Sequence, residues 1–358
     1  MTCGLDLIEK TIADIARRNA DLARFQGAHL IDLEPRYLVQ MAHLTAPAPI
    51  WKYVQGAVTK TAANMVILDL DDSVPADDPE ALRSGRENIV RAFNELDWGG
   101  KLRFFRPRGL QQDPGLHDTE FVIRHAGKNL DGLIYPKVEG PEEIGHLDEF
   151  LACVEEDGGL EKGSIKIGVM IESVLAEERA FEIARTSQRL VCLIFGAFDY
   201  WASLGLFHLD FRPDHPLISH ARCRIVKAAS HVGVPAIAEM SLNYPTKDKS
   251  PDQRRAALDE CRRDAELAVD YGFMGKWTGI PAQVDIALDV FGISAEKIDK
   301  AVREIGEFLK AKERGRGATI IDGKLADAAT DRMNRMILKA AYALGRLDAE
   351  LAVGLGIA

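Results

Sequence analysis

Eight short apolar runs, separated by stretches with helical spacing, constrain the fold of this chain more than any other feature. They begin at Arg36, Met65, Leu102, Gly132, Ile165, Leu190, Val234 and Gly272, roughly 25 to 45 residues apart. Amphipathic stretches such as EALRSGRENIVRAFNEL lie between most of them. Alternating strands and helices predict parallel strands joined by right-handed crossovers. Eight such units predict an α/β protein, a (β/α)8 TIM barrel, with an open doubly wound sheet as the alternative.

The pattern changes after the eighth run. Two amphipathic helical stretches follow, SAEKIDKAVREIGEFLKAKERG and LADAATDRMNRMILKAAYALGRL, and the segment between them has turn and strand character. We therefore expect an N-terminal helical segment over 1–34 and a barrel domain over 35–291. Residues 292–358 are expected to form a C-terminal helical extension that packs on the barrel or on a neighbouring subunit and contributes to oligomerisation.

Composition excludes several classes of function. The chain has 358 residues, 47% of them hydrophobic, which suits one large barrel with additions. Its net charge of −10 argues against nucleic acid or an anionic membrane as partner. Five scattered cysteines without a CxxC pair indicate reduced thiols. No apolar run approaches the roughly 20 residues of a membrane span or forms a signal-peptide core, so we expect a cytoplasmic protein.

Charged side chains end most of the predicted strands. They are Asp69, Asp71 and Asp72 on the second, Arg106 on the third, Lys137 on the fourth, Glu172 on the fifth, Asp199 on the sixth and Glu239 on the seventh. Because barrel active sites lie at the carboxyl ends of the strands, these residues are candidates for one site. Glu172 and Asp199 offer the oxygen ligands that suit Mg²⁺, and Arg106 offers a fixed positive charge for an oxyanion. Alternatively, the two acids cap helices or form ion pairs with Lys137 and Arg106.

Five segments resemble, in order, motifs of one enzyme family. They are MVILDLDDSVPADDPEALRSGR, GLIYPKVEGPEEI, IGVMIESVLAEERAFEIA, LIFGAFDYWASLG and GFMGKWTGIPAQVDIALDVF. They are similar to the citrate lyase β-subunit-like (malyl-CoA lyase-like) branch of the HpcH/HpaI aldolase superfamily, and the resemblance runs from about Arg36 to Asp327. It implies a barrel with a helical extension and an enzyme that makes or breaks carbon–carbon bonds next to a carbonyl, commonly in acyl-CoA thioesters.

The resemblance also implies roles for individual residues. The metal ligands for Mg²⁺ (or Mn²⁺) are Glu172 and Asp199, the catalytic residues are Arg106, Asp71 and Asp327, and the substrate-binding residues are Arg36, Asp72, Lys137 and Arg106. Arg103 is the second match for the family's strand-three arginine. In relatives the acid at Asp327 reaches a neighbouring subunit's site, which implies a homotrimer or hexamer.

Three positions depart from the family pattern near the expected pocket. Ile280 stands where a histidine is usual, Phe198 replaces a polar residue, and Ala238 replaces an aspartate, with Glu239 one place later. These changes leave open which acid and which acyl group react.

The leading function is therefore a Mg²⁺-dependent carbon–carbon lyase, or a synthase running in reverse, acting on a hydroxy-acyl-CoA or a related 2-oxo or hydroxy acid. A pyruvate-type class II aldolase that uses free aldehydes is the enzymatic alternative. The non-enzymatic alternative is a metabolite-binding or structural subunit of a larger lyase complex. The presence of Glu172, Asp199 and Arg106 together argues against this non-enzymatic alternative, because packing of the fold alone would not require all three charged side chains.

Overall fold

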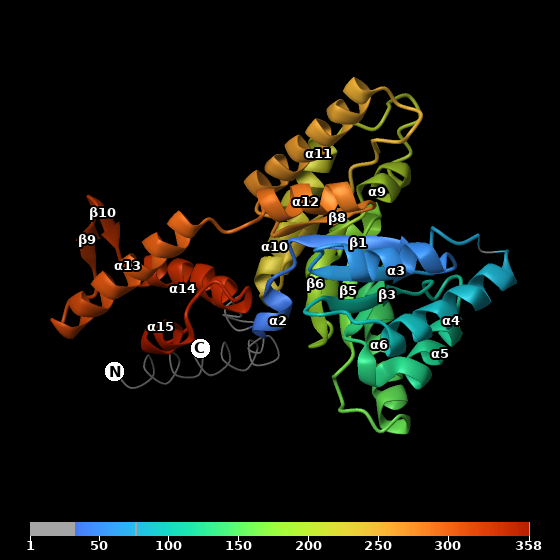
Figure 1. Ribbon diagram of the computed structural model, residues 1–358, viewed down its shortest axis with the longest axis horizontal. Helices are drawn as coiled ribbons and strands as arrows, with labels where there is room; N and C mark the ends of the chain where they lie inside the picture. The colour runs from blue at the N-terminus through green and yellow to red at the C-terminus, as the bar shows by residue number, and fades with distance from the viewer. Residues whose placement is uncertain (1–32, 76, 358) are drawn as a thin grey trace, which may run out of the picture.

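A closed barrel of eight parallel strands forms the centre of the molecule (Figure 1). The structure is a computed structural model, and it describes residues 33–75 and 77–357. Each strand pairs with the next in the chain, and β8 pairs with β1 to close the barrel. The strands are β1 Ala42–Pro47, β2 Met65–Asp69, β3 Leu102–Arg106, β4 Gly132–Tyr135, β5 Lys166–Ile171, β6 Leu190–Phe195, β7 Ala236–Ala238 and β8 Gly275–Thr278. The predicted (β/α)8 barrel is confirmed.

Helices cover the outside of the barrel. They are α3 Trp51–Lys60, α4 Pro79–Glu95, α5 His117–Ala126 with the 3-10 turn η2 Gly127–Asn129, α6 Pro141–Asp157, α7 Val174–Glu178, α8 Ala180–Ala184, α9 Ala197–Ser203, α10 Pro216–Val232, α11 Pro251–Tyr271 and α12 Pro281–Val290. Several begin with proline, whose fixed φ and missing N–H suit the first helical position. In the described part of the chain, no helix combines the length and apolar character that crossing a bilayer requires.

The apolar side chains of each strand divide between two cores. On β2, Met65 and Ile67 belong to the cluster inside the barrel, whereas Val66 and Leu68 pack against the surrounding helices. This division follows from the two-residue period of a strand. Both faces of each strand are therefore buried, which is why the strands read as continuous apolar runs in the sequence.

The first strand begins later than its apolar run predicts. The run was expected to be extended from Arg36, but Pro35–Leu38 forms a short helix, α2, and the strand begins at Ala42. Tyr37 and Leu38 are nevertheless buried, so the run is apolar because it packs beneath the barrel. Short apolar runs do not distinguish a buried helical turn from a strand by periodicity alone.

The residues after the barrel form a separate layer of helices. The extension contains α13 Ala295–Glu313, the hairpin β9 Thr319–Ile321 and β10 Lys324–Ala326, then α14 Ala328–Ala343 and α15 Ala349–Gly354. It has a small core of its own, which includes Ile298 and Leu338. Figure 1 shows the hairpin at the outer end of the extension, whereas α14 reaches back to α2. The N-terminal segment predicted over 1–34 lies, apart from its last two residues, outside the described residues.

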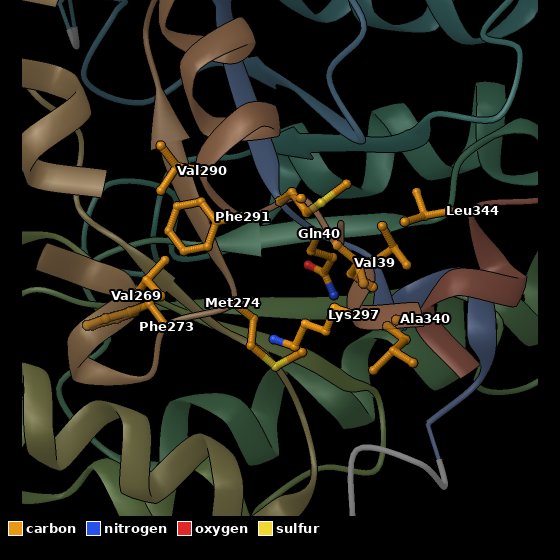
Figure 2. Close-up of a pocket in the computed structure, with 14 residues that line it drawn as sticks. Val39, Gln40, Val269, Phe273, Met274, Val290, Phe291, Lys297, Ala340 and Leu344 are labelled. Atoms are coloured by element: carbon orange, nitrogen blue, oxygen red, sulfur yellow. The ribbon is translucent and has the colours of Figure 1, made fainter. Parts of the chain in front are cut away.

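A cavity of about 230 Å³ lies where the extension meets the amino end of the barrel (Figure 2). Gln40 and Met274 line it from the barrel, and Lys297, Ala340 and Leu344 line it from α13 and the end of α14. Gln40 donates to the carbonyls of Tyr37 and Val191, so its amide is satisfied within the barrel wall. The cavity lies at the end of the barrel opposite to the charged strand ends.

Candidate active site

Arg106 and Asp69 form a buried ion pair at the mouth of the barrel. They occupy the last positions of β3 and β2, which are directly paired in the sheet. The guanidinium donates from Nε to Asp69 Oδ1 at 2.5 Å and from Nη2 to Oδ2 at 2.8 Å. Burial alone would lower the pKa of Arg106, but the charge of Asp69 outweighs it and raises that pKa. The pair therefore holds a permanent, oriented positive charge at the mouth.

Trp277 lies beneath this guanidinium. Its indole Nε1 donates to Thr45 Oγ1 at 2.5 Å, which fixes the ring across the junction between β8 and β1. The Arg106 guanidinium carbon is 5.4 Å from the centre of the Trp277 ring, within the range of a cation–π interaction. The remaining nitrogen, Nη1, lies 3.2 Å from Asp72 Oδ2. Arg106 is thus held by contacts from three sides.

Lys137 connects two parts of the site. Its backbone adopts φ +50°, a left-handed conformation that is uncommon for a side chain of this size. In this conformation its N–H donates to Glu172 Oε1 at 2.5 Å. Its ammonium donates to Asp71 at 2.9 Å and to Asp72 at 2.5 Å. A side chain held in a sparsely populated backbone conformation is typical of functional sites.

Glu172 and Glu239 each carry a buried carboxylate oxygen without a hydrogen-bond partner, but of the two only Glu239 has an ion pair among the described residues. The Glu172 side chain follows β5 and is 3% exposed. Oε1 accepts from Lys137, but Oε2 is buried and has no hydrogen-bond partner. Burial, and then the charge of Asp199, raise the pKa of Glu172 to about 7. A buried anionic oxygen without a partner is costly, so it points to a cation that completes the site.

Gly196 makes room for this carboxylate. A Cβ at position 196 would lie 2.5 Å from Glu172 Cβ and 2.6 Å from Oε2. Gly196 lies between the end of β6 and the start of α9, whose first turn carries Asp199. The absence of a side chain therefore allows two acids from neighbouring strands to face one space.

Replacing Gly196 with Ala is expected to weaken divalent-ion binding at least tenfold, because the new methyl group must displace the Glu172 carboxylate. Calorimetric titration of the protein with Mn²⁺ measures the change. Gly145→Ala is the control, because its nearest neighbouring atom would lie 3.9 Å from the added Cβ. Equal affinity of the Gly196→Ala variant and the native protein would contradict this account of Gly196.

Asp199 faces the same group of charges. It lies in the first turn of α9, and burial together with the charge of Asp72 raises its pKa. Its charge in turn acts on Glu172. Within the described part of the chain, Asp199 forms no ion pair, so neither it nor Glu172 is locked against a cation.

The charge balance of the mouth also suits a divalent ion. Its acids are Asp69, Asp71, Asp72, Glu172 and Asp199, and its cations are Arg106 and Lys137. Asp71 is held by Lys137 and lies 3.7 Å from Arg106. Among the described residues, no three His, Cys, Asp or Glu side chains converge on one point. Glu172 and Asp199 nevertheless offer two carboxylates, and such a pair fits an ion that takes two of them and completes its shell with water and substrate, as Mg²⁺ does.

Two predicted binding positions lie elsewhere. Arg36 belongs to α2 and pairs at 2.7 Å with Asp131, which precedes β4. Arg103, the second match for the strand-three arginine, is the second residue of β3. It also contacts Asp131, at 3.3 Å. Both are therefore at the amino end of the barrel. The structure does not bring Arg36 to the charged strand ends, and the substrate-binding role that the resemblance implies for it stays a prediction.

Asp327 and Glu239 are also placed outside this group. Asp327 caps α14, where its Oδ1 accepts from Ala329 N at 2.9 Å and from Thr330 N at 3.1 Å. The helix it begins is 16 residues long and reaches α2 only at its far end, so Asp327 is about 24 Å from that contact. Glu239, at the end of β7, is paired with Arg222 of α10.

Sequence reasoning counted Asp69 among the candidate strand-end acids but gave it no partner, and it assigned no part in the site to Gly196, Thr45 or Trp277. Asp69 was visible as an acid at a strand end, and Gly196 as a glycine directly after one. Their partners, Arg106 and Glu172, lie on neighbouring strands and far away in the chain.

Comparisons with known proteins agree with this architecture. The family model for HpcH/HpaI aldolase/citrate lyase matches residues 52–279. Over 299 residues the chain is 33% identical to the L-malyl-CoA/beta-methylmalyl-CoA lyase of Cereibacter sphaeroides, covering 78% of this chain and 88% of the relative.

Solved structures are similar in fold. A citrate lyase from Burkholderia xenovorans superposes with a TM-score of 0.70 at 19% identity, covering 88% of this chain and 96% of that one. The protein CitE of Mycobacterium tuberculosis, in complex with magnesium, acetoacetate and coenzyme A, has a TM-score of 0.59 at 22% identity, covering 84% of this chain and 97% of that one.

Proposed function

The chain belongs to the HpcH/HpaI aldolase/citrate lyase family, and from this premise we propose that it is a Mg²⁺-dependent carbon–carbon lyase that acts on a hydroxy-acyl-CoA thioester. The observation that carries the metal assignment is the buried, unpartnered Oε2 of Glu172, which shares its space with Asp199. The same metal accompanies coenzyme A in the M. tuberculosis CitE complex. Mn²⁺ has the same ligand preference and is expected to substitute.

A second cavity supports a thioester substrate. It has a volume of about 480 Å³ and lies between β1, α3 and the loop after β8. Lys52 and Lys60 line it together with the apolar surfaces of Tyr53 and Ile280. Two ammonium groups beside an apolar wall suit the phosphates and the pantetheine arm of coenzyme A. Ile280, one of the departures from the family pattern, is therefore placed to affect how the acyl carrier binds.

In the proposed mechanism, Glu172 and Asp199 hold the metal ion, which would supply positive charge to stabilise an enolate oxygen. Arg106, fixed by Asp69 and Trp277, places a permanent positive charge beside the carboxylate or the developing oxyanion of the substrate. Lys137 keeps Glu172 and Asp71 in position through its backbone N–H and its ammonium. Asp72, which is half exposed, completes the polar wall that orients the substrate.

Proton transfer is assigned to Asp327 of a neighbouring subunit. Cleavage requires a base to remove the proton of the substrate hydroxyl and an acid to protonate the thioester enolate. Asp327 lies on the extension, whose outer surface exposes Ile320, Leu325 and Met333, each about two-thirds exposed. Apolar side chains gathered in this way are typical of a subunit contact. We therefore propose a homotrimer or hexamer in which the extension covers a neighbour's barrel.

The substrate assignment is tested by the reaction in both directions. The native protein with Mg²⁺ is expected to condense glyoxylate with acetyl-CoA and to cleave the corresponding hydroxy-acyl-CoA, and EDTA is expected to stop both reactions. Condensation of pyruvate with small aldehydes, without any thioester reaction, would instead identify a class II aldolase. Chromatography of the acyl-CoA species distinguishes the two, because only the thioester reaction converts one acyl-CoA into another.

The assignment of Asp327 is tested by mixing inactive subunits. Glu172→Gln and Asp327→Asn variants are each expected to be inactive, whereas subunits exchanged between them should regain activity because some sites then combine a native barrel with a native extension. The 2-oxo acid formed on cleavage after mixing, followed as its phenylhydrazone, measures this recovery. Asp322→Asn, an exposed acid of the same hairpin, is the control and should remain active alone. A fully active Asp327→Asn variant would contradict the assignment.

A further inference from the structure

A buried ion pair, Arg222 with Glu239, lies next to the candidate site, between α10 and the end of β7. Arg222 of α10 is 1% exposed, and its guanidinium contacts Oε1 of Glu239 through Nη2 and, at 3.1 Å, through Nε. The Lys276 ammonium donates to the Glu239 carbonyl at 2.6 Å and adds a second positive charge. Burial would raise the pKa of Glu239, but Arg222 and Lys276 together lower it. The pair is therefore a permanent, charged junction between β7 and α10.

Arg222 also holds the loop that connects α9 to α10. Its Nη1 donates to the carbonyl oxygen of Pro213 at 2.6 Å. One guanidinium therefore joins three parts of the fold, namely the end of β7, the body of α10 and the loop 204–215. A lysine could not make these three contacts at once, because it lacks the planar fork of donors.

The loop held in this way packs on α9 through aromatic rings. The Phe211 ring centre is 4.1 Å from that of Phe198 and 5.8 Å from that of Trp201. The His215 ring stands edge-on to Trp201 at 5.0 Å. Phe198 and Trp201 flank Asp199 in the sequence on either side, on a helix of only seven residues. Tyr200 anchors the opposite face of that helix by packing on Phe195.

We infer that Arg222 and Glu239 form a positioning pair for Asp199, which acts through the 204–215 loop. The pair fixes the loop, the aromatic rings of the loop fix the rotation of α9 on its Tyr200 anchor, and that rotation sets where the Asp199 carboxylate stands relative to Glu172. The carboxylate has no ion pair of its own among the described residues to hold it, so its position depends on the helix. This inference rests on the proposed metal role of Glu172 and Asp199.

The test measures metal affinity without substrate, on the full-length protein in its native assembly. Arg222→Met removes the fork but leaves Glu239 beside Lys276, and Phe211→Ala breaks the aromatic contact without touching the ion pair. Electron paramagnetic resonance of free Mn²⁺ gives the dissociation constant, and circular dichroism checks folding. Both variants are expected to bind Mn²⁺ at least tenfold more weakly than the native protein.

Two controls separate positioning from a general loss of stability. Arg189→Met breaks an equally buried pair with Glu155 at the amino end of the barrel, where Nη1 and Oε1 are 2.6 Å apart. Phe207→Ala changes a ring of the same 204–215 loop that is 98% exposed. Both controls are expected to keep the native affinity within twofold. Weakening by Arg189→Met equal to that by Arg222→Met would overturn the inference.

The remaining outcomes distinguish this inference from the proposed function. If the native protein binds no Mn²⁺, the metal assignment fails and the positioning role fails with it. If the native protein binds Mn²⁺ and both Arg222→Met and Phe211→Ala match its affinity, the positioning role alone is wrong. If Arg222→Met does not fold, Phe211→Ala decides, because it leaves every ionic contact in place.

Discussion

Replacing Glu172 with Gln is expected to reduce turnover at least 1000-fold, on the order of 4 kcal/mol of transition-state stabilisation, while leaving the barrel folded. The amide keeps the shape of the side chain and accepts from the Lys137 N–H, but it is a poor ligand for Mg²⁺ and carries no charge. Formation of the 2-oxo acid from a hydroxy-acyl-CoA in saturating Mg²⁺, followed as its phenylhydrazone, measures the loss. Full activity of this variant would remove the metal assignment.

The same substitution is expected to stabilise the metal-free protein at neutral and alkaline pH. Burial raises the pKa of Glu172 from 4.5 to about 7, so the folded state holds a proton that the unfolded state has lost. The contribution of Glu172 to the free energy of unfolding of the native protein therefore falls as the pH rises from about 4.5 to 7. The whole decrease is about 3 kcal/mol, and the contribution does not change further above that pH. Gln does not titrate, so its advantage should appear across that range.

Thermal unfolding in EDTA at pH 5 and pH 8 checks this prediction. The difference in Tm between Glu172→Gln and the native protein should be small at pH 5 and clearly positive at pH 8. Glu155→Gln is a control, because Glu155 is a buried acid of α6 at the amino end of the barrel and, although burial would raise its pKa, its pairing with Arg189 lowers that pKa. That variant should lose stability at pH 8 and keep its activity. A Glu172→Gln protein that is less stable than the native one at pH 8 would show that burial does not destabilise the Glu172 anion.

Replacing Arg106 with Met is expected to affect both activity and stability. It leaves Asp69 without its bidentate partner at a position that is 0% exposed, and breaking a buried pair in this way costs about 3–5 kcal/mol. It also removes the fixed charge beside the substrate, so kcat/KM should fall at least 1000-fold. Arg106→Lys should recover part of the stability but little activity, because one ammonium cannot contact Asp69 in a bidentate manner.

The control for this pair of variants is Arg108→Met. Arg108 lies two residues further along, and its partner Asp118 keeps a second cation, Arg86, at 3.0 Å. Its loss should therefore cost less stability than the loss of Arg106 and should leave kcat/KM within a few-fold of the native value. Urea unfolding measures the change in stability, and the rate of 2-oxo acid formation measures the change in kcat/KM. Native activity in Arg106→Lys would refute the need for the guanidinium fork.

The sequence by itself determined the fold and most of the mouth of the barrel. Buried strands read as continuous apolar runs, and the residue after such a run must stand at the carboxyl end of its strand. Arg106, Lys137 and Glu172 could therefore be assigned to one face without a structure, since eight parallel strands expose their carboxyl ends together. The start of the first strand was less certain, because a short apolar run fits a helical turn such as α2 equally well.

Only the tertiary structure decided which charges meet and which stand free. The bond between Arg106 and Asp69 depends on the register of two strands, and the support from Trp277 depends on closure between β8 and β1. The free oxygen of Glu172 depends on Gly196, which follows the next strand. Local sequence fixes what a side chain is and which way its strand points, whereas its partners come from distant segments that are brought together by packing. That is why the sequence could propose the two acids but could not show that the pocket leaves one carboxylate oxygen without a partner.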